Sequence, residues 1–109
     1  MRKYIWGMDI AASARIADTA LIDRTWPKGV HIAPDCIFGE ESVLLTHDMA
    51  RGVYRDTRVG ARTVVGPRAI IMPGVTIGED CVIEPGAVVI KDMPDRTRAV
   101  GNPASIAPA

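Results

Sequence analysis

Aliphatic residues recur at a fixed step of six through the second half of the chain. They are Val59, Val65, Ile71, Ile77, Ile83 and Val89. Two residues before each of them is a side chain of small or moderate size: Thr57, Thr63, Ala69, Val75, Cys81 and Ala87. No helix has a period of six, whereas alternation within three residues is typical of a short strand. The pattern therefore predicts short strands whose two flanking side chains both point inward.

A turn is expected after each of these strands. Gly60, Gly66 and Gly78 directly follow inward aliphatic residues, and we expect them to adopt positive φ, which glycine tolerates without steric cost. Pro73-Gly74 and Pro85-Gly86 supply further turn chemistry. Six residues thus form one side of a polygon.

If three sides close one coil, residues eighteen positions apart stack, so that Val59 lies on Ile77 and Val65 on Ile83. Hexapeptide repeats are typical of a parallel β-helix, in which each coil contacts only its neighbours. A β-sandwich or barrel is the alternative for a chain rich in valine and isoleucine, but its strands usually run five or six residues between irregular loops. We predict an all-β, parallel β-helix.

The first half of the chain carries the same pattern with two interruptions. Its inward series is Ile10, Ile16 and Ile22, followed by Ile32, Phe38 and Leu44. Extra residues around Trp26–Gly29 predict a small protrusion at a corner, and the longer break at 45–56 predicts an extruded loop. We expect a single domain over 1–109, divided into coils at 10–44, the loop at 45–56, coils at 57–92 and a tail at 93–109.

Composition narrows the range of partners. The chain has 13 Lys and Arg against 13 Asp and Glu, which removes the electrostatic argument for binding nucleic acid or an anionic membrane. No apolar run suits a signal peptide or approaches the roughly 20 residues of a membrane span. Cys36 and Cys81 are too few for a disulfide framework, and their inward positions predict core packing. We expect a cytoplasmic protein.

Four segments resemble one known family. They are Leu45–Asp48, Ile71–Gly78, Val88–Pro94 and Gly101–Ala104. Together with the repeat, they are similar to the hexapeptide-repeat acyltransferases, which include serine, maltose and xenobiotic O-acetyltransferases. This resemblance implies a left-handed coil, although the general preference for right-handed crossovers predicts the opposite hand.

The resemblance also implies a function. The protein would be a homotrimer that binds acetyl-CoA in a groove between adjacent β-helices, with no metal. His47 matches the catalytic histidine of the family, and an imidazole is suited to taking a proton from an acceptor hydroxyl or amine as it attacks the thioester. The expected reaction is O-acetylation of a sugar or nucleotide sugar, with N-acetylation as the next choice.

Asp23 lies in a stretch that faces the acceptor cavity in the enzymes that the chain resembles, which makes it a candidate for contact with the acceptor. The loop charges add two more candidates: Asp48, which could also orient His47 or be a solvated loop carboxylate, and Arg51, which could meet an anionic acceptor. By the same resemblance, the positions expected to contact CoA are Gly66, Pro67, Pro85, Ile90 and Lys91. Because proline has no N–H to donate, the amide of Gly66 is expected to take the place of an amide at Pro67.

Two other functions are compatible with a β-helix. A trimeric zinc carbonic anhydrase uses the same coils but requires three histidines, and this chain has only His31 and His47. His31 is interpreted as an exposed strand or corner residue. A structural β-helix without catalysis is favoured by Pro67, Pro85 and the short C-terminus, whereas the loop histidine favours an enzyme.

Overall fold

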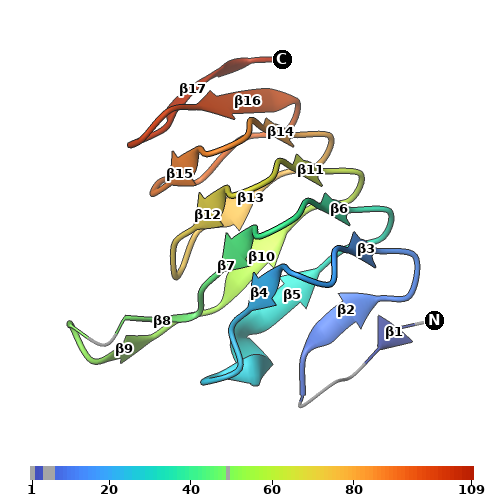
Figure 1. Ribbon diagram of the computed structural model, residues 1–109, viewed down its shortest axis with the longest axis vertical. Helices are drawn as coiled ribbons and strands as arrows, with labels where there is room; N and C mark the ends of the chain where they lie inside the picture. The colour runs from blue at the N-terminus through green and yellow to red at the C-terminus, as the bar shows by residue number, and fades with distance from the viewer. Residues whose placement is uncertain (1, 4–6, 49) are drawn as a thin grey trace.

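The computed structural model describes residues 2–3, 7–48 and 50–109. Its chain winds into a stack of triangular coils whose three sides are three sheets (Figure 1). Strands of successive coils pair in parallel, as in β10 with β13, β11 with β14 and β12 with β15. The predicted all-β, parallel β-helix is confirmed.

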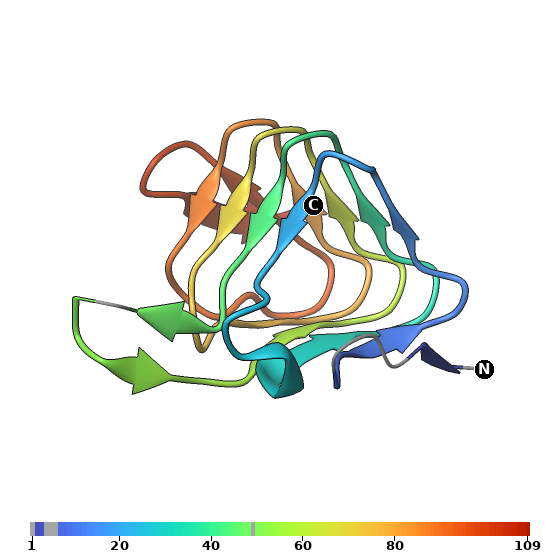
Figure 2. The same ribbon diagram turned by 60° about the horizontal axis from the view of Figure 1, so that its bottom comes forward.

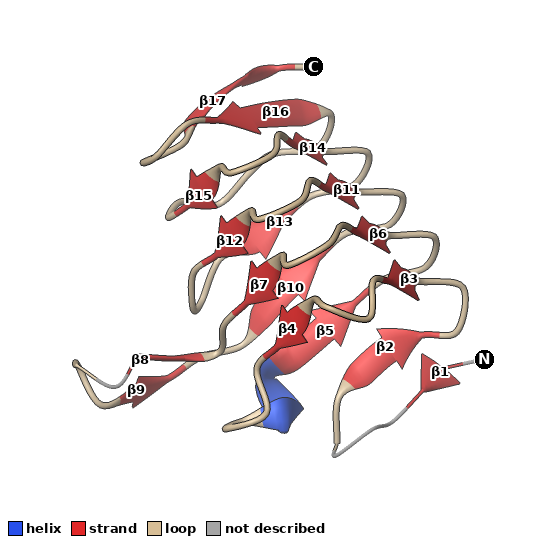
Figure 3. Cartoon of the chain, viewed as in Figure 1, coloured by secondary structure: helices blue, strands red, loops and turns tan. Residues whose placement is uncertain are grey.

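The strands are two to four residues long (Figure 3). Sheet A contains β1 (Arg2–Lys3), β2 (Asp9–Ala11), β5 (Val30–Ile32), β10 (Thr57–Val59) and β13 (Thr76–Ile77). Sheet B contains β3 (Arg15–Ile16), β6 (Ile37–Phe38), β11 (Val64–Val65), β14 (Val82–Ile83), β16 (Thr97–Val100) and β17 (Ser105–Pro108). Sheet C contains β4 (Leu21–Ile22), β7 (Val43–Leu44), β12 (Ile70–Ile71) and β15 (Val88–Val89). A separate hairpin consists of β8 (His47–Asp48) and β9 (Val53–Tyr54), and a short 3-10 helix spans Pro27–Gly29.

Inward aliphatic side chains form one ladder behind each sheet, in the register that the repeat predicts. Val59 pairs with Ile77 and Val65 with Ile83. The ladders continue downward into the first half of the chain, where Phe38 lies in register with Val65. Phe38, Val65 and Ile83 are each 1% exposed, so stacking removes these side chains from water almost completely.

The corner glycines have a different role from the one expected. Gly60, Gly66 and Gly78 do not adopt positive φ, so the predicted reason for them is wrong. A Cβ atom on Gly60 would lie 2.5 Å from the backbone of Gly78, because the next coil passes directly over this position. Gly74 and Gly86 do have positive φ, at 83° and 75°. Close approach of the next coil's backbone, and not dihedral freedom, therefore explains the glycines at positions 60, 66 and 78.

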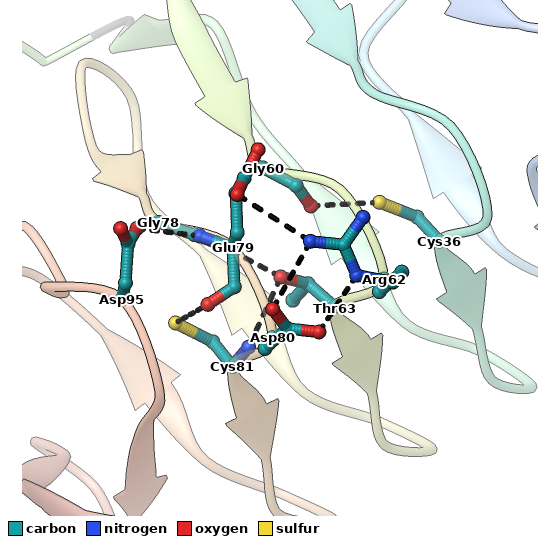
Figure 4. A network of polar contacts seen from close by, with 9 residues as sticks. All are labelled: Cys36, Gly60, Arg62, Thr63, Gly78, Glu79, Asp80, Cys81 and Asp95. Atoms are coloured by element: carbon teal, nitrogen blue, oxygen red, sulfur yellow. Dashed lines mark hydrogen bonds and ion pairs between the residues drawn. The ribbon is translucent and has the colours of Figure 1, made fainter.

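Side chains at the corner between sheets A and B link one coil to the next (Figure 4). The Cys36 thiol donates to the carbonyl of Gly60 over 3.0 Å, and the Thr63 hydroxyl donates to the carbonyl of Gly78 over 2.9 Å. Cys36 and Cys81 are completely buried, which confirms core packing. Burial raises the pKa of the Cys36 thiol, so the thiolate is disfavoured.

The coils extend beyond residue 92, where sequence analysis placed the start of a tail. β16 pairs in parallel with β14, which places Ala99, fully buried, beside Ile83. β17 then folds back antiparallel on β16. Among the described residues, no helix has the length and hydropathy needed to cross a membrane.

Candidate active site

The interruption at 45–56 is a hairpin that leaves the stack between sheet C and sheet A (Figure 1). β8 and β9 pair antiparallel, with His47 opposite Tyr54 and Asp48 opposite Val53. The predicted extruded loop thus contains a pair of antiparallel strands, and it carries the candidate catalytic histidine close to its base.

Thr46 anchors the base of this hairpin. It is fully buried, its N–H donates to the Asp23 carboxylate over 2.9 Å, and its hydroxyl donates to the carbonyl of Trp26 over 2.9 Å. Its own carbonyl accepts the N–H of Arg55 at 2.7 Å. These hydrogen bonds therefore fix the backbone directly before His47, the first residue of β8.

Asp23 holds the ring of His47. The carboxylate follows β4, is only 2% exposed, and its Oδ2 lies 2.5 Å from His47 Nδ1. A carboxylate only accepts hydrogen bonds, so Nδ1 carries the proton and Nε2 keeps its lone pair. Within the described part of the chain, no hydrogen bond engages Nε2. The imidazole is thus oriented as a base.

The polar surroundings of Asp23 stabilise its charge. Burial alone would raise the pKa of this carboxyl, but hydrogen bonds from the backbone N–H groups of Thr46 and Thr25, together with His47, outweigh burial and hold the pKa below its ordinary value of 3.8. Asp23 is consequently ionised at neutral pH and able to stabilise an imidazolium on His47.

Aromatic side chains pack around the histidine. The Tyr54 ring stacks on His47 with centroids 6.3 Å apart, and Trp26 meets Tyr54 edge-on with centroids 6.1 Å apart. The His47 side chain is 18% exposed. Together with Asp23, these contacts leave the ring little freedom to rotate.

Asp48 is the last residue of β8, and Arg51 lies in the turn of the hairpin that follows it. Asp48 Oδ1 accepts the N–H groups of Ala50 and Arg51 at 3.0 and 3.3 Å, and the two side chains form an ion pair of 3.7 Å. Asp48 therefore shapes the turn and does not orient His47. A role for either residue in acceptor binding remains a prediction.

Two cavities flank the hairpin. The larger, of about 730 Å³, is lined by His47, Asp23, Leu45 and the inward side chains of the first coil. The smaller, of about 330 Å³, is lined on its hairpin side by Asp48, Arg51, Val53 and Arg55 and on its coil side by Met72, Pro73 and Ile90. The candidate base thus faces the first cavity, and one predicted CoA position faces the second.

The five predicted CoA positions lie on two different corners. Gly66, Pro67 and Pro85 are on the corner between sheets B and C, whereas Ile90 and Lys91 follow β15 on the corner between sheets C and A. The N–H of Gly66 donates to the carbonyl of Ile83 over 2.8 Å, so it already has a partner within the coils and is not free to replace the missing amide of Pro67.

Sequence reasoning missed the part that Asp23 plays toward His47. It proposed Asp23 as an acceptor contact, which stays a prediction, but the bond to Nδ1 was not expected. One signal was present: at the position after the inward residue of sheet C, the later coils have Leu45, Met72 and Ile90, and only the first has a carboxylate.

His31 lies away from this site. It points outward from β5, where its two ring nitrogens lie 3.3 Å from Asp9 and 2.9 Å from Asp56. Its side chain is 22% exposed, so it is more enclosed than the exposed residue that was expected. Over the residues that the structure describes, no group of three or more His, Cys, Asp or Glu side chains is arranged to hold a metal ion.

Comparison with known proteins agrees with the repeat and the coil. The family model for the bacterial transferase hexapeptide (six repeats) matches residues 56–91. Over these residues, which are about a third of the chain, the sequence is similar to the hexapeptide-repeat family. Its fold is the left-handed parallel β-helix, the hand that the resemblance implied.

Several proteins are similar to this hexapeptide-repeat chain over most of its length. The putative acetyltransferase YvoF of Bacillus subtilis (strain 168) is 30% identical over 101 residues, which are 91% of this chain and 59% of YvoF. The polySia specific acetyltransferase NeuO is 26% identical with a TM-score of 0.71, covering 87% of this chain and 48% of NeuO. PerB from Caulobacter crescentus, solved with CoA and GDP-perosamine, is 25% identical with a TM-score of 0.59, covering 90% of this chain and 56% of PerB. The chain thus spans about half to three fifths of these proteins.

Proposed function

We propose that this chain forms an acetyl-CoA-dependent acetyltransferase that acetylates a hydroxyl group of a carbohydrate-containing small molecule, with His47 as the general base. The observation that carries the proposal is the Asp23 carboxylate on His47 Nδ1, which leaves the Nε2 lone pair beside a cavity of about 730 Å³. An amine acceptor would use the same base and is the second choice.

The proposed chemistry needs little more than the dyad formed by His47 and Asp23. As the acceptor oxygen attacks the thioester carbonyl carbon of acetyl-CoA, its proton passes to His47 Nε2, and the Asp23 carboxylate stabilises the imidazolium. The tetrahedral intermediate then expels CoA by breaking the C–S bond, and the proton on Nε2 passes to the departing sulfur. The products are the acetyl ester and free CoA thiol, and His47 returns to its starting state.

The similar proteins support this class of reaction. YvoF and NeuO are both named as acetyltransferases, and PerB was solved with CoA and a nucleotide sugar. These names describe those proteins, and their use for this chain is part of the proposal.

The division of the predicted CoA positions between two corners favours a site shared by two copies of the chain. One ligand can reach both corners if the corner between sheets B and C of one subunit lies against the hairpin side of another. It would then contact Gly66, Pro67 and Pro85 of the first subunit and Ile90 and Lys91 of the second. We therefore include a homotrimer with CoA between its subunits in the proposal.

The outward faces of the sheets support a closed ring. Sheet C presents an apolar ladder of Leu21, Val43, Ile70 and Val88. Sheet B presents Ile37, Val64 and Val82, with Arg15 and Arg98 at the two ends of the same row. Sheet A presents Asp9, His31, Arg58 and Thr76. A cyclic trimer needs two different complementary patches on each copy, and the apolar row of sheet C and the apolar centre of sheet B supply such a pair.

Oligomeric state is tested by light scattering on the purified chain and two variants. Val64→Lys places a charge in the sheet B ladder and is expected to dissociate the trimer. Thr76→Lys, the control, makes a similar change on the polar face of sheet A and is expected to leave the trimer intact. A wild-type monomer at assay concentrations would sink the shared site.

Catalysis is tested by acetyl-CoA binding and by CoA thiol release with a panel of sugars, nucleotide sugars and amines. His47→Ala is expected to lower kcat by about 10²–10⁴-fold while CoA binding persists. His31→Ala is the matched control, because it removes the other histidine from the outer face of sheet A. If the wild-type protein neither binds acetyl-CoA nor releases thiol with any acceptor, the enzyme proposal fails and the structural β-helix is favoured.

A further inference from the structure

Two inward side chains of the first coil are less enclosed than those directly next to them in the second coil. Ile16 and Ile22 point inward but are only half-buried, whereas Phe38 and Leu44, directly next to them in the second coil, are 1% and 0% exposed. Figure 2 turns this end of the stack, from β2 to β4, toward the reader. Over the residues that the structure describes, the ladders of sheets B and C thus end in an apolar well, whereas Met8 and Ile10 on its sheet A side are buried, at 4% and 5% exposed.

The well and the candidate base share one cavity. Its apolar walls are the inward side chains Met8, Ile10, Ala14, Ile16, Ala20 and Ile22, and Thr19, Leu21, Arg24 and Thr25 complete its rim. His47 and Asp23 line the same space, next to Leu45. The cavity therefore has a polar end that can perform proton transfer and an apolar body that has no role in that chemistry.

We propose that this well binds an apolar group of the acceptor, so that the substrate is a hydroxyl-bearing molecule with an alkyl or aryl substituent and not a bare sugar. This inference rests on the proposed function and narrows its substrate class. A volume of about 730 Å³ is within the usual range for pockets that enclose a small organic ligand, and predominantly apolar walls with a few convergent polar groups are typical of them. A fully hydroxylated sugar would leave its hydroxyl groups without partners against these walls.

Continuity with the dyad is what favours an acceptor over a second copy of the chain as the occupant. A ligand whose apolar group fills the space between Ile16 and Ile22 extends toward His47, where its hydroxyl meets the Nε2 lone pair. A copy stacked end to end would instead cover Asp23 and His47 and block access to the base.

A binding experiment tests the well without requiring turnover. Alkan-1-ols from ethanol to hexanol are titrated into protein labelled with ¹³C at the isoleucine methyl groups. The methyl signals of Ile16 and Ile22 should shift in a saturable way, and affinity should rise by about fourfold for each added methylene. Ala20→Leu fills the well and should remove this dependence, whereas Ile16→Ala enlarges it and should move the optimum to a longer alcohol.

Ala107→Leu is the matched control, because it adds the same side chain to an exposed position of β17 at the opposite end of the stack. It should leave the chain-length dependence unchanged, and thermal unfolding of every variant checks that the coils are intact. The inference is overturned if the Ile16 and Ile22 signals do not shift, if affinity is independent of chain length, or if the signals respond only to dilution of the protein, as a second copy in the well would require.

Turnover of methyl and hexyl β-D-glucoside with acetyl-CoA separates this inference from the proposed function. Acetylation of both at equal kcat/KM would support the enzyme and reject the apolar subsite. Saturable alcohol binding without thiol release from any acceptor would support the well and reject the enzyme.

Discussion

The first coil and the last strands end the same aliphatic ladders in different ways. At the C-terminal end, β16 adds another rung, β17 folds back on it, and Ala99 is completely buried. At the other end, Ile16 and Ile22 are only partly buried, while the polar Asp23 beside them is almost fully buried. At this end, burial of polar and apolar side chains is therefore the reverse of what stability alone would favour.

This difference shows how a solenoid acquires a site. Each coil buries its interior only against its neighbours, so a terminal coil needs a cap. The C-terminal end uses β16 and β17 for that purpose. Over the described residues, the first coil instead leaves Ile16 and Ile22 partly exposed and fixes the Asp23 carboxylate by hydrogen bonds, an arrangement that suits ligand binding.

The largest expected effect comes from changing the carboxylate of the open end. Asp23→Asn keeps the shape of the side chain, but its amide can donate to Nδ1, which favours the histidine tautomer with a proton on Nε2. We expect kcat to fall by about 10²–10⁴-fold, close to the loss in His47→Ala, with CoA binding retained. The double variant should lose little more than either single one, because the two residues act as a unit.

A merely structural role for Asp23 would give a different result. In that case Asp23→Asn would lower the melting temperature and the active fraction, but the pH dependence of kcat in the remaining enzyme would be unchanged. Steady-state kinetics across pH, with active-site concentration taken from CoA binding, distinguishes the two outcomes.

The second prediction compares the same ladder at two heights. Ile83 is 1% exposed between two coils, and Ile83→Ala should lower the free energy of unfolding by about 2–5 kcal/mol because it leaves a cavity. Ile16 is only partly buried in the first coil of the same sheet, and Ile16→Ala should cost about 1 kcal/mol, since solvent already reaches it. Urea unfolding of both variants measures the difference, and equal losses would mean that the well is closed in solution.

The repeat predicted the ladders in detail because a period of six leaves only one register for inward residues. The repeat alone was enough to predict that Val59, Ile71 and Ile83 point into the core. The step from Val89 to Met93 is four, so the phase is lost there and β16 was assigned to a tail. Periodicity places residues only where the period is kept.

The hydrophobic pattern could not predict the contact between Asp23 and His47, for a different reason. The two residues are separated by more than a full coil with its extra corner residues, and whether their side chains meet depends on how the hairpin leaves the stack. The fully buried Thr46, bonded to Asp23 and Trp26, sets that direction. A sequence motif located the histidine, but tertiary structure was needed to find its partner.

The third prediction concerns glycine within the stacked coils. Gly60 lies beneath the backbone of Gly78, so Gly60→Ala should cost about 1–3 kcal/mol, and Gly60→Asn should cost at least as much. Gly52, in the hairpin turn, has φ of 65° and open space around it, so Gly52→Asn should be nearly neutral because asparagine tolerates this conformation. Thermal unfolding of Gly60→Asn and Gly52→Asn measures the difference. If Gly60→Asn were as stable as the wild type, backbone dihedral freedom, and not close approach of the next coil, would explain the glycine at position 60.

The smallest expected effect is a difference in acid stability between the two parts of the stack. Asp23 at the open end and Asp80 on an outer corner both have pKa values below 3.8: hydrogen bonds outweigh burial at Asp23, and the Arg62 guanidinium acts on Asp80. A carboxyl whose pKa is lowered by folding adds stability above its unfolded pKa of about 3.9, and this stability is lost as pH falls through the folded value. Asp23→Asn should therefore flatten the decline in unfolding free energy below about pH 4, and Asp80→Asn should flatten it less, because water and salt screen the exposed ion pair. Urea unfolding between neutral pH and about pH 2, in low and high salt, measures both slopes. An equal, salt-sensitive change in the two variants would mean that solvent reaches Asp23 as freely as it reaches Asp80.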